Sequence, residues 1–271
     1  GLLAVVAGII LSGSGINPAY FISFFFLFLL YEIVSFVIGL RDRTAFTSIK
    51  HFLFVAGIIV LVNLFWILPT VSFVFKNIAP TGSIDKIGFT NWIDSLSKNT
   101  SPLNIMRVQG AWDWYAFDSI AGLPLYIPYA LNYFYHPIFI VFSFILPSLA
   151  MLAFILRGKE RKYLYTTFGL MFVIGVFLGA GTYLPTGTIY RWFIIHLPFF
   201  TLFRSPWYIF TPMVLLGIAG SITIFFQEIL DFLRNRTKRI LAGGIVGGLS
   251  ISFIVANLFY NWPLVTGGIF R

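Results

Sequence analysis

Two aspartates beside aromatic side chains are the first residues whose types suggest chemistry. Asp113 lies in Trp112-Asp113-Trp114-Tyr115, and Asp118 follows five residues later. A sugar site combines aromatic rings, which stack on sugar C–H faces, with a carboxylate that binds hydroxyls or takes a proton. Trp and Tyr also gather at membrane interfaces, where a neighbouring aspartate is simply solvated. We take Asp113 and Asp118 as candidate catalytic residues and Trp112 as a candidate substrate contact, with the interfacial belt as the alternative.

Cationic side chains in the same half of the chain are candidates for binding a phosphate. Arg204 precedes Ser205-Pro206-Trp207, where the proline favours a turn into a helix. A guanidinium can hold a phosphate through two parallel hydrogen bonds. The other candidate substrate-binding residues are Arg107, Arg191, His196 and Trp207. The alternative for each arginine is snorkelling toward ordinary lipid headgroups.

Metal and nucleotide chemistry have little support in the sequence. The chain has no cysteine, and its three histidines lie far apart without metal-ligand spacing. No glycine-rich phosphate loop or nucleophile elbow occurs. The pairs Gly243-Gly244 and Gly247-Gly248 instead favour close helix packing. We predict no metal ligands, although a divalent cation bound with a phosphate would be compatible with this chain.

The elements that must hold these side chains are membrane helices. Of the 271 residues, 59% are apolar and only 10% are charged, against ~25% charged in soluble domains. The net charge of +9 fits basic loops that set membrane orientation rather than a nucleic-acid surface. The composition therefore predicts an all-α integral membrane protein with membrane lipid, and no nucleic acid, as partner.

Seven apolar runs predict about seven transmembrane helices. The first, Leu2–Leu11, is shorter than the ~20 residues of a full span, so we expect upstream sequence to be missing. The other six runs are long enough to cross: Tyr20–Leu40, Phe52–Phe73, Pro137–Leu156, Leu164–Ala180, Phe210–Ile229 and Ile240–Tyr260. Residues 1–271 thus form a single polytopic membrane domain, expected to be a fragment of a longer chain.

Three short basic loops predict the orientation. Loops 41–50, 157–163 and 230–239 follow every second crossing and carry 11 of the 18 Lys and Arg residues. Since basic residues collect in cytoplasmic loops, we place these three in the cytoplasm and the chain in the cell membrane.

The opposite, extracytoplasmic side receives two longer segments, 74–135 and 181–207. Within them, Phe89–Leu96 and Ile189–Pro198 repeat apolar residues at helical spacing, which predicts interfacial or re-entrant helices. A loop of this length is usually functional or partly folded.

Two polar residues fall inside predicted spans. Glu32, next to Tyr31, is either a functional group or a structural hydrogen-bond partner. Asn63 is predicted to link neighbouring helices. Otherwise the spans offer few polar groups of the kind that line a transporter.

Several segments together resemble the membrane domain of GT-C glycosyltransferases, specifically the arabinofuranosyltransferase-like proteins of actinobacteria and archaea. The resemblance covers roughly residues 60–271. It is carried by Asn63–Pro69, Asn99–Trp112, Phe203–Trp207 and Trp262–Gly268. It implies a cell-envelope enzyme that passes a sugar from a polyprenyl-phosphate donor to a glycan or lipid-linked acceptor outside the cytoplasm.

The same resemblance implies an inverting displacement, with Arg204 first, then Arg191 and Arg107, at the donor phosphate. These enzymes usually carry the catalytic acid in the first outer loop, and we expect this chain to begin after that point. Asp113 and Asp118 would then shape the site rather than act as base. Two alternatives stay open: a non-catalytic membrane subunit that joins other membrane subunits, and a lipid or solute transporter.

Overall fold

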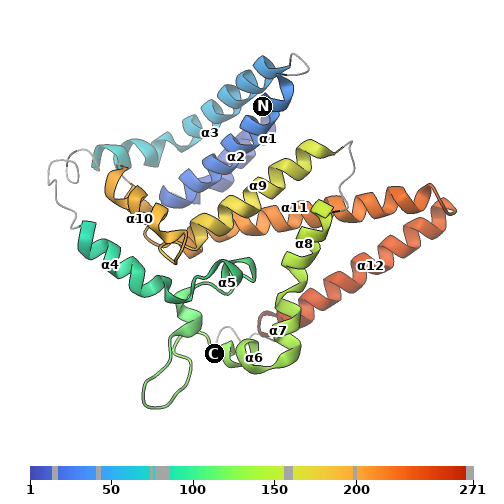
Figure 1. Ribbon diagram of the computed structural model, residues 1–271. Coiled ribbons are helices and arrows are strands. Elements are labelled where there is room, and N and C mark those ends of the chain that lie inside the picture. The colour runs from blue at the N-terminus through green and yellow to red at the C-terminus, as the bar shows by residue number, and fades with distance from the viewer. Residues whose placement is uncertain are drawn as a thin grey trace.

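The computed structural model describes residues 1–13, 18–40, 44–73, 76, 86–155, 161–197 and 200–266. These residues form helices and connecting turns, with one isolated bridge between Phe117 and Pro124 (Figure 1). The longer helices are α1 (Leu2–Leu11), α2 (Pro18–Gly39), α3 (Ala45–Phe73), α4 (Lys86–Leu96), α8 (Ile145–Ile155), α9 (Lys162–Gly179), α10 (Gly187–His196), α11 (Pro206–Arg234) and α12 (Arg239–Tyr260). The short ones are η3 (Ser97–Asn99), α5 (Pro102–Met106), η4 (Trp112–Tyr115), α6 (Ala130–Tyr135), α7 (Pro137–Ser143), η5 (Phe200–Phe203) and α13 (Trp262–Val265).

The predicted fold class is confirmed. In the described part of the chain six segments are long and apolar enough to cross a membrane: α2, α3, α7 with α8, α9, α11 and α12. They coincide with the six long runs of the sequence, and α1 is the seventh, shorter apolar helix. The chain is therefore an all-α, multi-pass membrane protein.

A break separates α7 from α8, and Pro147 in the first turn of α8 accounts for it. A proline has no N–H for the carbonyl four residues earlier, here that of Ser143, and its ring crowds that turn. The helix accordingly ends at Ser143 and restarts at Ile145. The Ser143 hydroxyl donates to the Ile140 carbonyl at 2.6 Å.

The centre of the protein is the pair α9 and α11. Their backbones approach closely because both carry glycine at the crossing. A Cβ at Gly217 would lie 2.6 Å from the backbone N of Phe172, and one at Gly175 would lie 2.9 Å from the backbone N of Val214. Real Cβ contacts are not this short, so the crossing requires glycine at both positions.

Polar side chains join the first three helices. Asn63, fully buried in α3, donates to the Gly8 carbonyl of α1 at 3.0 Å and accepts from Trp66 Nε1 at 2.7 Å. This confirms the prediction that Asn63 links helices. Glu32 in α2 lies 2.6 Å from Nδ1 of His51 in α3, so its structural partner is a histidine on the next helix.

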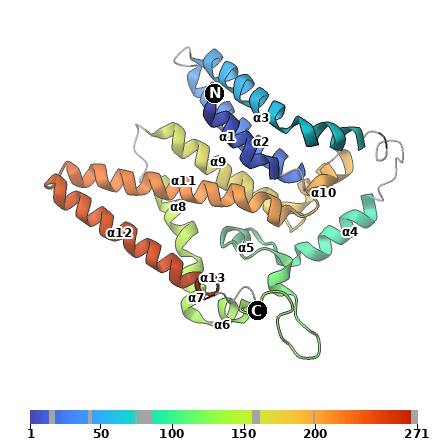
Figure 2. The same cartoon turned by 180° about the vertical axis from the view of Figure 1, so that it is seen from behind.

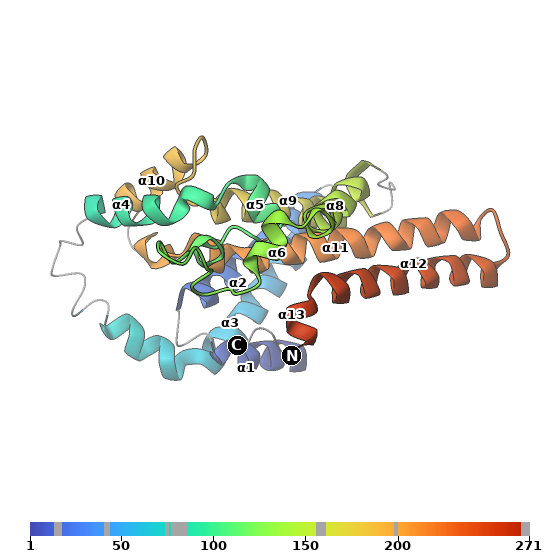
Figure 3. The ribbon, with the colours of Figure 1, turned by 90° about the horizontal axis from the view of Figure 1, so that it is seen from below.

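The last span, α12, is different, because only 6% of its most apolar 18-residue stretch is buried within the chain. It runs antiparallel beside α11, and Figure 3 shows the two extending together away from the other helices. A Cβ at Gly243, Gly244, Gly247 or Gly248 would meet nothing within 4 Å. The close packing expected at these glycines is thus not made with any described residue of this chain, because the glycine face points away from α11.

The two ends of the helix bundle carry different elements. The ends of α2, α8 and α11 and the starts of α3, α9 and α12 lie together at one end (Figures 1 and 2). The short helices and α4 and α10 lie at the other end. At the first end Arg161 bonds Glu228 at 2.9 Å and Asp231 at 2.7 Å, both on α11.

Candidate functional site

Asp113 is the candidate carboxylate that the fold links to a distant helix. It lies in η4, and its Oδ2 accepts a 2.6 Å hydrogen bond from the Tyr208 hydroxyl in the first turn of α11. Its Oδ1 is buried and has no hydrogen-bond partner. Burial raises the pKa of nearby Tyr129, and the negative charge of Asp113 raises it further. The bond from Tyr208 fixes the orientation of the carboxylate, as a general base requires.

Asp118 has a different setting, in the turn of a short hairpin. Its Oδ1 accepts the backbone N–H groups of Ile120 and Ala121, both at 2.7 Å. The bonds from Ala121 and then Ile120 lower the pKa of Asp118. Gly122 completes the turn with a positive φ of 65°. Asp118 therefore caps its own loop and makes no contact with Asp113 in the structure.

Trp112 and Trp207 belong to one packed cluster rather than to an open platform. Trp207 is 1% exposed, and Trp112 packs against its cluster and meets the Tyr126 ring edge-on at 5.2 Å. Trp207, a candidate substrate-binding residue from the sequence, therefore has no ring face open to a ligand. Trp112 is partly buried and keeps some accessible surface.

Arg107 lies beside the break between α7 and α8. Its Nε donates to Ser143 Oγ at 2.7 Å, and its guanidinium carbon lies 4.7 Å from the centre of the Phe144 ring. A tight turn follows: Val108 has φ 60°, and the N–H groups of Val108 and Gln109 bond the carbonyls of Ile105 and Asn104. Val108 follows the C-terminus of α5, at a position where glycine is usual. The left-handed backbone there costs a residue with a side chain about 1–2 kcal/mol.

Arg191 is occupied by a carboxylate of the protein. Its Nη2 lies 2.9 Å from Asp94 Oδ2, which ties α10 to α4. The two predicted amphipathic stretches lie in α4 and α10, and this ion pair joins the two helices. The pair also neutralises the cation that we expected at a phosphate, so Arg191 is a weaker candidate than the sequence suggested.

His196 and Arg204 are both exposed. The His196 ring stacks on Trp192 at 4.8 Å, and its Nδ1 lies 2.9 Å from the Trp192 carbonyl, so its contacts are within α10. Arg204 stands just before α11 and forms no ion pair with any residue that the structure describes. It is the free cation nearest in sequence to Tyr208, the partner of Asp113.

No family model, curated protein or solved structure matches this chain.

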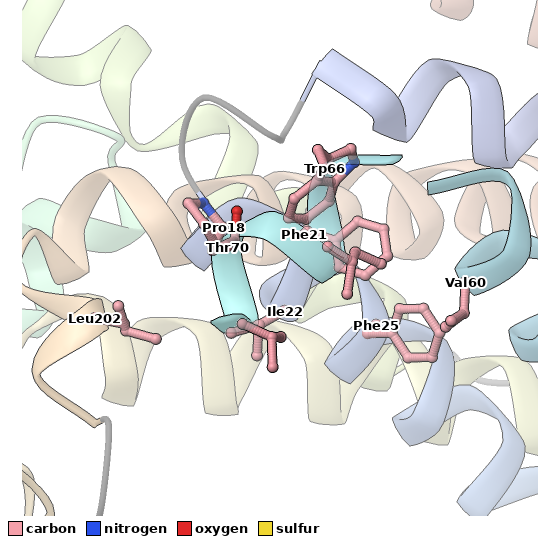
Figure 4. Close-up of a pocket in the computed structure, with 10 residues that line it drawn as sticks. Pro18, Phe21, Ile22, Phe25, Val60, Trp66, Thr70 and Leu202 are labelled. Atoms are coloured by element: carbon pink, nitrogen blue, oxygen red, sulfur yellow. The ribbon is translucent and has the colours of Figure 1, made fainter. Parts of the chain in front are cut away.

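An apolar cavity of about 540 Å³ opens between α2 and α3 (Figure 4). Its walls are formed by aromatic and aliphatic side chains with Thr70, and Leu202 closes one side. Leu202 is two residues before Arg204, so this unpaired cation is close in the chain to the wall of the cavity. Because its walls are apolar, this cavity suits a hydrocarbon chain rather than a sugar.

The candidate site is therefore partly assembled. The structure brings Asp113 and Trp112 to the start of α11, close in sequence to Arg204, and sets Asp118, Arg191 and His196 in separate local contacts. Sequence reasoning missed Tyr208, Ser143, Gln109 and Tyr260. Only Tyr208 had a signal, as the aromatic that follows Trp207. The described residues include no cluster of three His, Asp or Glu side chains that could hold a metal ion.

Proposed function

We propose that this chain is a membrane glycosyltransferase that uses a polyprenyl-phosphate sugar on the extracytoplasmic side. The observation that carries the proposal is Asp113, whose one oxygen is held by Tyr208 while the other is buried and unused. The aromatic surroundings of Asp113 and the apolar cavity beside Leu202 support it.

In the proposed reaction Asp113 takes the proton of an acceptor hydroxyl, and so has the role that the resemblance gives to an acid of the first outer loop. The acceptor oxygen then bonds to the anomeric carbon while the bond from that carbon to the phosphate oxygen breaks, and polyprenyl phosphate leaves with the electron pair. Arg204 would stabilise the charge on the leaving phosphate. The neighbouring Tyr115 cannot replace the base at neutral pH, because burial raises its pKa to about 12.

The proposed orientation places the basic loops 41–50, 157–163 and 230–239 in the cytoplasm of a cell-membrane protein. The helix ends that flank them lie along one side of the bundle, away from α4 and α6 (Figure 1). The chain has no cysteine, so a single cysteine introduced in place of Thr237 or Ile120 can be labelled selectively. We expect a membrane-impermeant maleimide to label Ile120→Cys in intact cells and Thr237→Cys only after permeabilisation.

Replacing Asp113 tests the catalytic proposal. We expect Asp113→Asn to lower transfer from polyprenyl-phosphate-linked, radiolabelled sugars by at least ~100-fold, the usual contribution of a general base. Asp118→Asn is the matched control, since this carboxylate caps an exposed turn, and it should keep wild-type activity. Membranes containing each variant at equal abundance are compared.

Full activity in Asp113→Asn would reject Asp113 as the base. A chain without transfer activity that co-purifies with another membrane protein would instead favour a non-catalytic subunit. The open glycine face of α12, where an added Cβ meets nothing within 4 Å, is the observation in favour of that second candidate.

A further inference from the structure

Arg107 is held in place by the protein but is not neutralised by it. Its bond to Ser143 uses a neutral hydroxyl, and Phe144 supplies a ring face. None of the described carboxylates lies within ion-pair distance of its guanidinium. A half-buried cation without a counter-charge favours an anionic ligand, which would supply charge-assisted hydrogen bonds to the remaining N–H groups.

Neutral hydrogen-bonding groups surround this cation. Gln109 is 1% exposed, and its Nε2 donates to the Tyr260 hydroxyl at 2.7 Å, whereas its Oε1 is buried with no partner. Tyr115 lies near enough for the charge of Arg107 to act on it. The free Gln109 oxygen calls for a donor such as a hydroxyl, so the site suits a ligand with both an anion and a hydroxyl group.

An apolar groove reaches the same place from the interior of the membrane. Helices α8, α11 and α12 enclose a groove of about 340 Å³, lined by residues such as Leu146, Phe226, Phe253 and Asn257. A small cavity continues it, sharing Leu146 and Asn257 with the groove and ending at Tyr260. This cavity measures only about 10 Å³, but it brings the lining of the groove to Tyr260, the hydrogen-bond partner of Gln109.

We propose that Arg107, Gln109 and Tyr260 bind the headgroup of an anionic phospholipid whose acyl chain lies in the α8–α11–α12 groove. Arg107 binds the phosphate, and Gln109 Oε1 accepts a hydrogen bond from a headgroup hydroxyl. The site is separate from the α2–α3 cavity near Arg204 and does not depend on the proposed transfer reaction. Phosphatidylglycerol, with its phosphodiester and hydroxyl groups, is the matching probe.

Native mass spectrometry of the full chain, released from phosphatidylcholine nanodiscs that contain phosphatidylglycerol, tests this site. We expect the wild-type protein to retain phosphatidylglycerol in preference to phosphatidylcholine. Arg107→Gln should lower that retention about tenfold or more, the size expected for losing a charged hydrogen-bond donor. Arg107→Lys should restore part of it, and Arg191→Gln, which removes a cation already paired with Asp94, should retain lipid as the wild type does.

A second variant keeps the test decisive if Arg107→Gln does not fold. Gln109→Leu removes the unpartnered oxygen and should weaken retention of phosphatidylglycerol while leaving phosphatidic acid, which lacks the headgroup hydroxyl, unchanged. Equal retention by wild type and Arg107→Gln, or equal loss in Arg191→Gln, would overturn the proposal. Displacement of the lipid by soluble glycerol phosphate at equal concentration would also overturn it, because the acyl chain in the groove would then add nothing to binding.

Discussion

Helices α11 and α12 are neighbours with similar apolar, glycine-containing sequences, yet the chain uses them in opposite ways. Half of the most apolar 18-residue stretch of α11 is buried, whereas only 6% of the corresponding stretch of α12 is buried. Gly217 of α11 meets the backbone of α9, whereas Gly243 of α12 faces open space. In a bilayer, lipid tails are as apolar as leucine, so apolar content alone does not bring helices together. Close backbone approach and polar links do.

The strongest test of this contrast is Gly217→Val. Its side chain would begin 2.6 Å from a backbone atom of α9, and overpacking of this kind costs about 1–3 kcal/mol or more. We expect a large loss of thermal stability in detergent, or no folded protein. Gly243→Val, which adds the same side chain to the open face of α12, should unfold within a few degrees of the wild type. Equal effects of the two variants would contradict the contrast.

Removing a buried polar link should have a smaller effect. Asn63→Leu loses the bond to the Gly8 carbonyl and leaves Trp66 Nε1 without its acceptor, and such links contribute about 0.6–1.7 kcal/mol in membranes. Asn257→Leu on α12 is the control, because the Asn257 amide bonds only its own helix, at the Phe253 carbonyl. Unfolding in a denaturing detergent compares them. If Asn257→Leu is the more damaging, the linking role of Asn63 is wrong.

The ion pairs of Arg161, just before α9, with the C-terminal part of α11 should contribute least. Arg161→Ala removes the pairs with Glu228 and Asp231, whose side chains are partly exposed, and such pairs contribute about 0.2–1 kcal/mol each. We therefore expect a loss of about 1 kcal/mol that shrinks as salt is added. Arg236→Ala, which removes only a cation–π contact with Phe232, should show a smaller loss without this salt dependence. A salt-independent loss in Arg161→Ala would argue for packing of the side chain instead.

Two arginines of the connecting segments show a parallel contrast. Arg191 is paired with Asp94 on the facing helix, while Arg107 has a hydroxyl and a ring as neighbours. From the sequence alone, both arginines are candidates for binding a phosphate. Only the fold distinguishes them, because Asp94 lies 97 positions away in the chain and reaches Arg191 through the packing of α4 on α10.

The sequence by itself determined the class of the protein, its spans and the positions of its polar helix links. Long apolar runs must form helices in a bilayer, since backbone groups have no water to bind there. These features follow from local chemistry, so they can be read without knowledge of the neighbours.

Tertiary structure decided which side chains meet. Asp113 gained Tyr208 from α11, Asp118 closed its own turn, and Trp207 was buried in the core. The glycines of α9 and α11 became a crossing, whereas those of α12 stayed open. Each of these outcomes depends on which helix faces are paired, and in a uniformly apolar chain many pairings bury similar surfaces. The choice therefore rests on shape and on a few polar contacts between distant residues.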